Sequence, residues 1–562
     1  MNILGISCHY HDSAASLVKN GVLVAAAEEE RFTRKKHDNS FPTNAIEYCL
    51  KEGKIIADEV DVAAFYDKPM LKFDRILHTS VEYFPKSFGM FCEAVPQWLT
   101  EKLRIPSLLK NRIGYRGEVM FIEHHKSHAA SAFFVSPFEE AAIVTVDGIG
   151  EWTSAAIHHG KDNKIEVLKE IRFPHSLGLF YSTMTSYLGF KVNNDEFKVM
   201  GLSAYGTPIY YNKFKNVIDV KEDGSFNLNM KYFSYTYDKK MFSDLFEKKF
   251  GPRREYEDKI TNRHKNIAAT LQKITEETML KIVNYAHKLT GSENLCMAGG
   301  VALNCVANGR VSREGPFKRI FIQPAATDAG GSLGASFYVY NQIYGNPRKY
   351  VMKDTYLGPS FNEKEIKTCL EKNKVECEKL NNKRLIEKTA ILISQDKIVG
   401  WFQGRMEFGP RALGSRSILA NPKNPKMKDI LNKKVKHREP FRPFAPSILR
   451  ENAKDYLVRA CDSPFMLVAF DVKKDGIKDI ISATHVDGTC RPQTVERRRN
   501  KLYHNLIYEF KKRTGIPVVI NTSFNVRGEP IVCTPEDAYN CFKNTGIDYL
   551  VIGNYFISKE EN

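Results

Sequence analysis

The chain has 562 residues, which is too long for one hydrophobic core, so two or three domains are expected. Its hydrophobic content of 43% and charged content of 27% are those of an ordinary globular protein. No apolar run approaches the roughly 18 residues of a membrane-spanning helix. The formal net charge of +17 fits a partner that is a nucleic acid, a membrane surface or a phosphorylated anion.

The cysteines and the first residues indicate a cytoplasmic location. The eleven cysteines are scattered and form no CxxC pair, which favours reduced thiols over zinc ribbons or disulfides. The start, MNILGISCHYHDS, lacks the features of a signal peptide. Two basic runs, Lys423 to Arg438 and Arg497 to Lys501, contain no interleaved aromatics, which weakens a binding platform for single-stranded nucleic acid. Neither a nucleic acid nor a membrane is an expected partner. Ordinary solvated faces remain the alternative explanation of these runs.

The first 27 residues predict a three-stranded meander. Ile3 to Ile6, Ala14 to Val18 and Val22 to Ala27 are short apolar runs, and Asn20-Gly21 is a strong hairpin signal. The polar loop after the first run contains His11 and Asp12.

The same pattern returns between residues 143 and 171. Ile143 to Val146, Thr153 to Ile157 and Ile165 to Ile171 are again three strands, with Asp147-Gly148 in the first turn. Such a divergent repeat is typical of the actin, sugar kinase and Hsp70 class (ASKHA), in which two α/β halves face a nucleotide cleft. Chance similarity of two short meanders is the alternative.

A histidine pair precedes the second meander. His124 and His128 are four residues apart, so on a helix their imidazoles share one face and can bind one metal ion. Asp147, at a strand end, can supply a carboxylate ligand. Two ordinary surface histidines would be the alternative.

Two strand–glycine–helix units follow a helix predicted over Asn262 to Leu289. Leu295 to Ala298 leads into Gly299-Gly300, and Arg319 to Ile322 leads into Asp328-Ala329-Gly330-Gly331. Paired glycines let backbone N–H groups approach an anionic ligand, although they also serve helix packing.

A second domain is expected beyond the polar segment 346–359. Leu385 to Ser394 is helical in pattern, and Lys397 to Phe402 and Val518 to Asn521 read as strands. FGPRALGSRSI and FRPFAPS combine arginines with Gly, Pro and Phe, which favours an anion site over a salt-bridged surface.

These motifs together resemble the O-carbamoyltransferases of antibiotic and nodulation-factor biosynthesis. The resemblance covers nearly the whole chain in nine ordered motifs, including CHYHDSAAS, EHHKSHAASAFF, FKVMGLSAYG, MAGGVALNCVANG, GRMEFGPRALGSRSI and NTSFNVRGEP. It implies residues 1–350 as an ASKHA-type domain similar to tRNA threonylcarbamoyl transferase. Residues 351–562 would be an α+β YrdC-like domain that forms carbamoyladenylate from carbamoyl phosphate and ATP, with Mg²⁺.

The resemblance also implies roles for individual residues. His11 matches the general base, with Asp12 as its orienter or as a substrate contact. The implied metal ligands, for iron(II) in the family, are His124, His128, Asp147 and Asp328. The implied nucleotide-binding residues are Asp147, Glu151, Gly299, Gly300 and Asn304. The implied carbamoyl phosphate and adenylate contacts are Arg411, Lys436, Arg442, Arg491, Asn521 and Ser523.

The acceptor is expected to be a hydroxyl of a small molecule such as a sugar, a glycan or an antibiotic. Selectivity for the acceptor is expected in the region Val217 to Tyr256. The resemblance also suggests a homodimer. Imidazole and carboxylate ligands also suit manganese or zinc. Three alternatives remain: a HypF-like hydrogenase-maturation enzyme, a tRNA-modifying threonylcarbamoyl transferase, and a nucleotide-binding protein without transfer chemistry. Lys198 has no assigned role.

Overall fold

The computed structural model describes residues 1–559, which form two compact units. The first unit contains Met1–Glu29 and His37–Met352. The second contains Lys353 onward together with the short segment Glu30–Lys36. The predicted division after residue 350 did not assign the early segment Glu30–Lys36 to the second unit.

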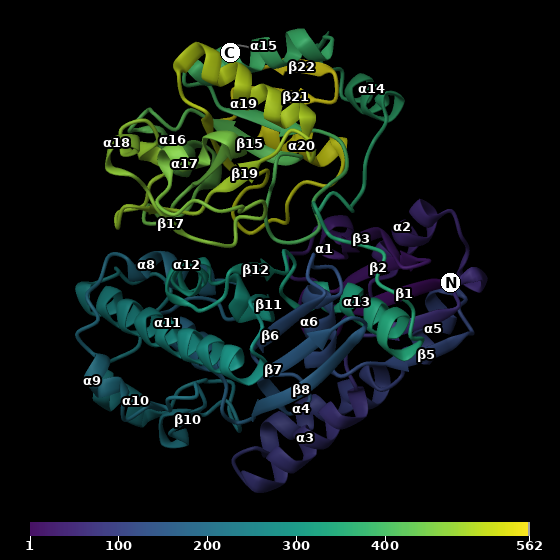
Figure 1. Cartoon of the computed structure of the whole chain (residues 1–562), viewed down its shortest axis with the longest axis vertical. Coiled ribbons are helices and arrows are strands. Elements are labelled where there is room, and N and C mark those ends of the chain that lie inside the picture. The colour runs from purple at the N-terminus through teal and green to yellow at the C-terminus, as the bar shows by residue number, and fades with distance from the viewer. Residues whose placement is uncertain (560–562) are drawn as a thin grey trace. The chain divides into compact units, whose positions relative to one another are not determined.

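The first unit contains two five-stranded sheets with the same topology (Figure 1). In the first sheet, β1 (Asn2–Ser7) pairs antiparallel with β2 (Ala14–Lys19), which pairs antiparallel with β3 (Val22–Glu28). On the other side of β1, β4 (Val62–Phe65) and β5 (Glu118–Phe121) continue the sheet in parallel.

The second sheet repeats this order. The meander is β6 (Glu140–Val146), β7 (Thr153–Lys161) and β8 (Lys164–Arg172), and the parallel strands are β11 (Asn294–Ala298) and β12 (Arg319–Ile322). The duplicated actin-like α/β topology that the two sequence meanders predicted is therefore present.

Two helices pack between the sheets and against each other. Helix α13 (Asp328–Phe337) contacts β1 and β2, and α6 (His124–Phe133) contacts β6, β7 and β11. Their close approach requires glycine, because a Cβ at Gly334 would lie 1.9 Å from the backbone oxygen of Ser127. This central pair of helices brings residues from both halves of the repeat to one point.

The other helices of the first unit surround the sheets. The helix predicted over Asn262 to Leu289 is α11 (Asn262–Thr290), which ends at Gly291 with φ +65°. The remaining helices are α2 (Thr43–Gly53), α3 (Pro69–Glu82), α4 (Phe88–Gln97), α5 (Ile105–Ile113), α7 (Leu177–Tyr187), α8 (Glu196–Ser203), α9 (Tyr211–Phe214) and α12 (Cys305–Glu314). None of the helices within residues 1–559 is long and apolar enough to cross a membrane.

The expected peripheral substructure near residues 215–260 is a small folded layer. It contains the hairpin β9 (Ile218–Val220) and β10 (Phe226–Leu228) and the helix α10 (Asp244–Phe250). Buried aromatic rings hold α10 against α7, with the ring centroids of Phe246 and Tyr187 4.9 Å apart.

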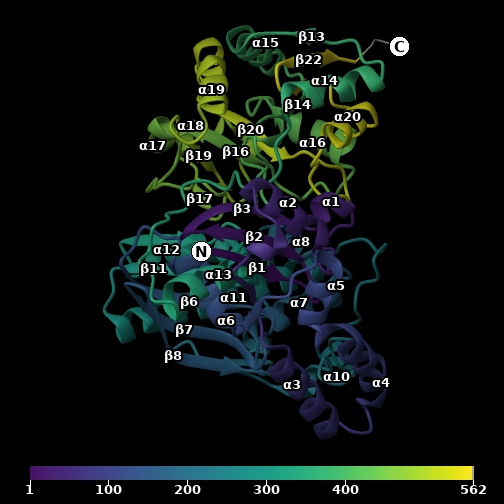
Figure 2. The same ribbon diagram turned by 90° about the vertical axis from the view of Figure 1, so that its right-hand side faces the viewer.

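The second unit is an α+β domain built on one mixed eight-stranded sheet (Figure 2). Its strands, in spatial order, are β13 (Glu378–Lys379), β22 (Tyr555–Ser558), β21 (Tyr549–Ile552), β14 (Val399–Phe402), β15 (Arg416–Ala420), β20 (Val518–Ser523), β16 (Ala445–Leu449) and β19 (Gln493–Val495). Val399 and Trp401 belong to one core cluster, whereas Ile398 and Phe402 belong to the other. This alternation reflects the period of two along a strand.

Helices cover both faces of this sheet. Side chains of α15 (Asn382–Ser394) and α19 (Lys501–Thr514) belong to one core cluster. Those of α14 (Glu363–Lys372), α16 (Met427–Leu431) and α20 (Pro535–Lys543) belong to the other. The segment Glu30–Lys36, which contains α1 (Glu30–Thr33), adds the side chain of Phe32 against Met406, Ile531 and Cys533.

Candidate functional site

The two histidines of the HxxxH motif lie on one face of α6, as their spacing predicts. The Nε2 atoms of His124 and His128 are 3.1 Å apart, and both side chains are 1% exposed. Two ring nitrogens at this distance compete for the same carboxylate, because Asp147 Oδ2 lies 3.1 Å from His124 Nε2 and 2.8 Å from His128 Nε2. A cation among them would satisfy all of these atoms at once.

Asp328, the first residue of α13, supplies the fourth ligand candidate. Its Oδ1 lies 3.6 Å from His124 Nε2 and 3.7 Å from His128 Nε2. Ligand atoms of His124, His128, Asp147 and Asp328 all lie within 4.8 Å of one another, and all four residues are buried. Two imidazoles and two carboxylates in this arrangement are a donor set that fits iron(II), manganese or zinc.

The electrostatics of this cluster reflect buried groups of opposite charge. Burial opposes ionisation, yet hydrogen bonds to Asp147 and Asp328 raise the pKa of His128 to about 9. Burial would raise the pKa of Asp147, but hydrogen bonds from His124 and His128 hold it well below its usual value. The cluster therefore stabilises two charged carboxylates, which is the state that a metal requires.

Backbone groups and a neighbouring phenol orient the two carboxylates. Asp147 Oδ1 accepts a hydrogen bond from Gly148 N at 2.7 Å and lies 3.3 Å from Gly300 N. Tyr66, just after β4, donates its hydroxyl proton to Asp328 Oδ2 at 3.1 Å. Sequence reasoning missed Tyr66, because it has no motif and reaches Asp328 across 262 positions of the chain.

Glu151 holds the start of α6. Its carboxylate accepts hydrogen bonds from His124 N at 3.0 Å and Lys68 N at 2.8 Å. A negative charge at a helix N-terminus is stabilising, and here it fixes the turn that carries the first metal-ligand candidate. These contacts account for the buried carboxylate of Glu151, whose role as a nucleotide contact stays a prediction.

His125 turns away from the cluster, as the helix spacing requires. Its Nδ1 lies 2.8 Å from Thr145 Oγ1, which lies 3.2 Å from His158 Nε2. Burial lowers the pKa of both His125 and His158, the latter to about 3, so both are neutral and pack α6 against the second sheet.

His11 and Asp12 lie in the loop between β1 and β2. His11 Nδ1 lies 3.1 Å from Asp12 Oδ2, so the carboxylate can orient the imidazole. Burial opposes the charge, but Asp328 and Asp12 together raise the pKa of His11 to about 10. The base candidate thus lies within the electrostatic reach of the carboxylate cluster.

The glycine pair of the predicted nucleotide segment follows β11. Gly299 has φ +90°, and a Cβ there would lie 2.3 Å from Val146 O, so close backbone packing requires glycine. Gly300 begins a short 3₁₀ turn, and α12 starts only at Cys305. The Oδ1 atom of Asn304 accepts a hydrogen bond from Ala307 N at 3.0 Å and caps α12. Nucleotide binding by these three residues stays a prediction.

One of the cationic residues predicted in the second unit, Lys436, reaches the end of β20. Lys436 is 3% exposed, and its Nζ donates to Ser523 O and, at 2.9 Å, to Asn525 Oδ1. Burial and the charges of Arg438 and Arg442 hold the pKa of Lys436 well below its usual value. Charge repulsion between such groups is relieved by a bound anion.

Asn521 presents an unsatisfied acceptor. Its Nδ2 lies about 3 Å from three oxygens, those of Ala412, Ser447 and Gln493. Nδ2 must therefore be the nitrogen end of the amide. Within residues 1–559, buried Oδ1 of Asn521 and Nε of Arg491 have no hydrogen-bond partner. Arg411 directly precedes Ala412, whose carbonyl oxygen accepts one of these hydrogen bonds.

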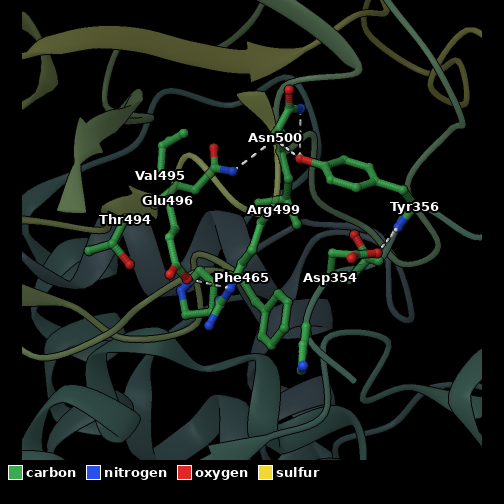
Figure 3. Close-up of a pocket in the computed structure, with 13 residues that line it drawn as sticks. Asp354, Tyr356, Phe465, Thr494, Val495, Glu496, Arg499 and Asn500 are labelled. Atoms are coloured by element: carbon green, nitrogen blue, oxygen red, sulfur yellow. Dashed lines mark hydrogen bonds and ion pairs between the residues drawn. The ribbon is translucent and has the colours of Figure 1, made fainter. Parts of the chain in front are cut away.

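A pocket of the second unit lies next to Asn521 (Figure 3). Leu413 and Gln493 line it, and Gln493 also contacts Asn521. Tyr356 and Asn500 point toward each other in this pocket, with a hydrogen bond of 3.0 Å. The residues that line it do not include Arg411, Lys436, Arg442 or Arg491.

Comparisons with known proteins follow the same division of the chain. The family models described as Carbamoyltransferase N-terminus and Carbamoyltransferase C-terminus match residues 2–337 and 390–559. An uncharacterized protein of Synechocystis sp. is 48% identical over 99% of this chain and 97% of its own length. Nodulation protein NolNO of Sinorhizobium fredii is 36% identical, covering 98% and 79%. The 3'-hydroxymethylcephem-O-carbamoyltransferase of Amycolatopsis lactamdurans is 24% identical, covering 98% of each chain.

Proposed function

Because the chain belongs to the carbamoyltransferase family, and is therefore an enzyme, we propose that it is an ATP-dependent O-carbamoyltransferase with two active sites, one in each unit. The second unit joins carbamoyl phosphate and ATP, as its Mg²⁺ complex, into carbamoyladenylate. The first unit transfers the carbamoyl group to a hydroxyl of a small-molecule acceptor. The observation that carries this proposal is the buried cluster of His124, His128, Asp147 and Asp328 beside His11.

The four-residue cluster would hold a divalent metal, with iron(II) favoured. The metal would polarise the phosphoryl oxygen of the mixed anhydride and so make the carbamoyl carbon more electrophilic. Gly148 N and Tyr66 keep the two carboxylates directed at this position. Gly299, Gly300 and Asn304 lie on the adjacent turn and are proposed to bind the adenosine part.

His11 is proposed as the general base. An alcohol ionises far above neutral pH, so its attack requires removal of the proton as the bond forms. The pKa of His11 is raised chiefly by the charges of Asp328 and Asp12. A cation held by Asp328 and Asp147 would offset part of this negative charge, which lowers the pKa of His11 toward the range of an effective base.

The chemistry proposed for the second unit rests on its cationic side chains and on the Oδ1 atom of Asn521, which has no hydrogen-bond partner within residues 1–559. Arg411, Lys436, Arg442 and Arg491 are proposed to bind the phosphate groups, and Ser523 lies 3.4 Å from Lys436 Nζ. The Oδ1 atom of Asn521 is suited to accept a hydrogen bond from the carbamoyl NH₂ group. Acyl groups without an N–H would leave this buried acceptor unpaired, which disfavours them.

The acceptor is proposed to be a hydroxyl on a sugar, glycan or antibiotic-like molecule. The name of the Amycolatopsis relative describes transfer to a hydroxymethyl group of a cephem, which is consistent with such an acceptor. The small aromatic layer that contains α10 is the region in which we propose acceptor selectivity.

The test measures the reactions of the two proposed active sites separately. The purified protein, given ATP, Mg²⁺ and labelled carbamoyl phosphate without acceptor, is expected to release pyrophosphate. His124→Ala should preserve this release and reduce bound iron and carbamoyl transfer by at least about 100-fold. Arg491→Ala should do the reverse, retaining bound iron while losing pyrophosphate release. Failure of the wild-type protein to release pyrophosphate with any divalent metal would refute the carbamoyladenylate route.

A second variant pair tests the role of Asn521. Asn521→Ala removes the acceptor for the carbamoyl NH₂ group, and we expect pyrophosphate release to fall about 10- to 100-fold, corresponding to about 1–3 kcal/mol. The exposed Asn382 on α15 offers the matched control, and Asn382→Ala should release pyrophosphate at the wild-type rate. Equal rates for Asn521→Ala and wild type would remove Asn521 from the site.

A further inference from the structure

The motif FKVMGLSAYG contains a buried charge that the proposed reaction does not use. Lys198 lies on α8, and its Nζ forms a 2.9 Å ion pair with Asp195 Oδ2. The two side chains are 7% and 4% exposed. A buried ion pair of this kind fixes the position of its neighbours, since removing either partner would leave a charge unpaired.

The next contact is made by Asn194. Its Nδ2 donates a hydrogen bond to Asp195 Oδ1 at 2.9 Å. A carboxylate only accepts hydrogen bonds, so the orientation of the Asn194 amide is determined. Its Oδ1 therefore faces His37, whose Nε2 lies 2.8 Å away and must carry a proton.

His37 connects this pair to Asp12. His37 Nδ1 lies 2.6 Å from Asp12 Oδ1, while the other oxygen of Asp12 lies 3.1 Å from His11 Nδ1. Both ring nitrogens of His37 thus act as donors when Asp12 is ionised. The pKa of Asp12 is held well below its usual value, because the charge of His11 and hydrogen bonds from both histidines outweigh burial.

The loops that carry these contacts adopt an unusual backbone conformation. Asp12, His37 and Asn193 have φ values of 53°, 55° and 58°, in the left-handed region that non-glycine residues rarely occupy. Asn, Asp and His are the residues that tolerate this region best, and such conformations concentrate at functional sites. Three separate loops therefore adopt this conformation at or beside the contacts.

We propose that Asn194 and His37 are positioning residues for the base His11, with the Lys198–Asp195 ion pair as their anchor. This inference rests on the proposed O-carbamoyl transfer. Asp12, held by His37, accepts a hydrogen bond from the Nδ1–H group of neutral His11, so that the unprotonated Nε2 of His11 is available to the acceptor hydroxyl. In the transfer step the hydroxyl proton moves to Nε2, the oxygen–carbamoyl carbon bond forms, and the carbon–oxygen bond to AMP breaks with its electron pair on AMP.

The first measurement reads the tautomer of His11 without reference to activity. The full-length protein is labelled with ¹⁵N-histidine and loaded with diamagnetic zinc, and the His11 signals are assigned with His11→Gln. Wild type should show a protonated Nδ1 and an unprotonated Nε2. Asn194→Leu should show averaged signals of both tautomers, whereas Asn194→Asp, which keeps an acceptor oxygen, should restore the wild-type pattern.

The second measurement follows AMP formation from ATP and carbamoyl phosphate with water as the acceptor. Asn194→Leu and His37→Gln should slow AMP formation about 10- to 100-fold without changing pyrophosphate release. Asn194→Asp should recover most of the rate, and the exposed His78→Gln is the matched control.

The outcomes separate failure of the proposed function from failure of the positioning role. If wild type forms no AMP, the proposed function fails, while the tautomer measurement still tests whether Asn194 and His37 position His11. Identical His11 signals in wild type, Asn194→Leu and His37→Gln would overturn this positioning role even in an active enzyme. Because Asn194 and His37 are only half-buried, both variants are expected to fold.

Discussion

At the residue scale, the proposed metal binding should depend on pH through His128. Its pKa is about 9 in the folded protein, against 6.5 for an unperturbed histidine, because hydrogen bonds to Asp147 and Asp328 outweigh burial. A raised folded-state pKa contributes stability that is fully present below about pH 6.5 and is lost as the pH rises through about 9. A metal needs the neutral imidazole, so metal binding must release this proton.

We therefore expect two opposite trends between pH 6.5 and pH 9. With a chelator present, the unfolding free energy of wild type should fall relative to that of His128→Gln as the pH rises. The apparent affinity for iron(II) or zinc should instead increase, by up to tenfold per pH unit for each proton released. Denaturant titrations and calorimetry in buffers of different ionisation enthalpy measure these quantities. A metal affinity that is constant over this range would contradict the assignment of His128 as a ligand.

At the scale of elements, the metal-ligand candidates depend on how closely α6 and α13 approach. Gly334 on α13 faces the backbone oxygen of Ser127 on α6, and a Cβ would lie 1.9 Å from it. Gly334→Ala must therefore separate the helices that carry His124, His128 and Asp328. We expect a loss of about 1–3 kcal/mol in stability and a larger relative loss of metal affinity.

The matched control for this change is Gly89→Ala on α4. A Cβ at Gly89 meets no atom within 4 Å, and alanine favours a helix by up to about 1 kcal/mol over glycine. This variant should keep its metal affinity and be as stable as wild type or more so. Thermal unfolding and zinc titration compare the stability and the zinc affinity of the two variants. Normal zinc binding by Gly334→Ala would disprove the role of the helix contact.

At the scale of the whole molecule, an early segment of the chain belongs to the second unit. Arg34 donates hydrogen bonds to the backbone oxygens of Ile531 at 2.7 Å and Pro530 at 3.0 Å, and lies 3.5 Å from Asp537 Oδ1. Two compact units need not unfold in a single transition. A substitution within the first tenth of the sequence should then destabilise the unit formed mainly by residues 353–559.

Arg34→Met tests this expectation. Trp401 is buried in the second unit, so replacing Trp98 and Trp152 by Phe leaves its fluorescence as a specific probe. We expect the transition reported by Trp401 to lose about 1–3 kcal/mol, because two buried carbonyl groups lose their donor. The exposed Arg172, which pairs with Glu170, provides the control Arg172→Met. An unchanged Trp401 transition in Arg34→Met would show that Glu30–Lys36 does not stabilise this unit.

The sequence by itself determined the features that appear as a periodic pattern, a short spacing or an ordered set of motifs. Alternating apolar runs predicted both meanders, because the period of a strand appears directly in neighbouring residues. The spacing of His124 and His128 predicted their shared helix face, and the order of nine motifs identified the family. The C-terminal strands and helices around β14 and β20 followed from the same periodicities.

Only the tertiary structure decided the contacts that support these features. Glu151 holds the start of α6, a contact that its predicted nucleotide-binding role did not include, and Tyr66 orients Asp328 although it belongs to no recognised motif. His37 meets Asn194 across 157 positions of the chain. The segment Glu30–Lys36 joins the second unit for the same kind of reason. Such partners are selected by packing between distant loops, and a pairing of this kind imposes no period on the residues around it.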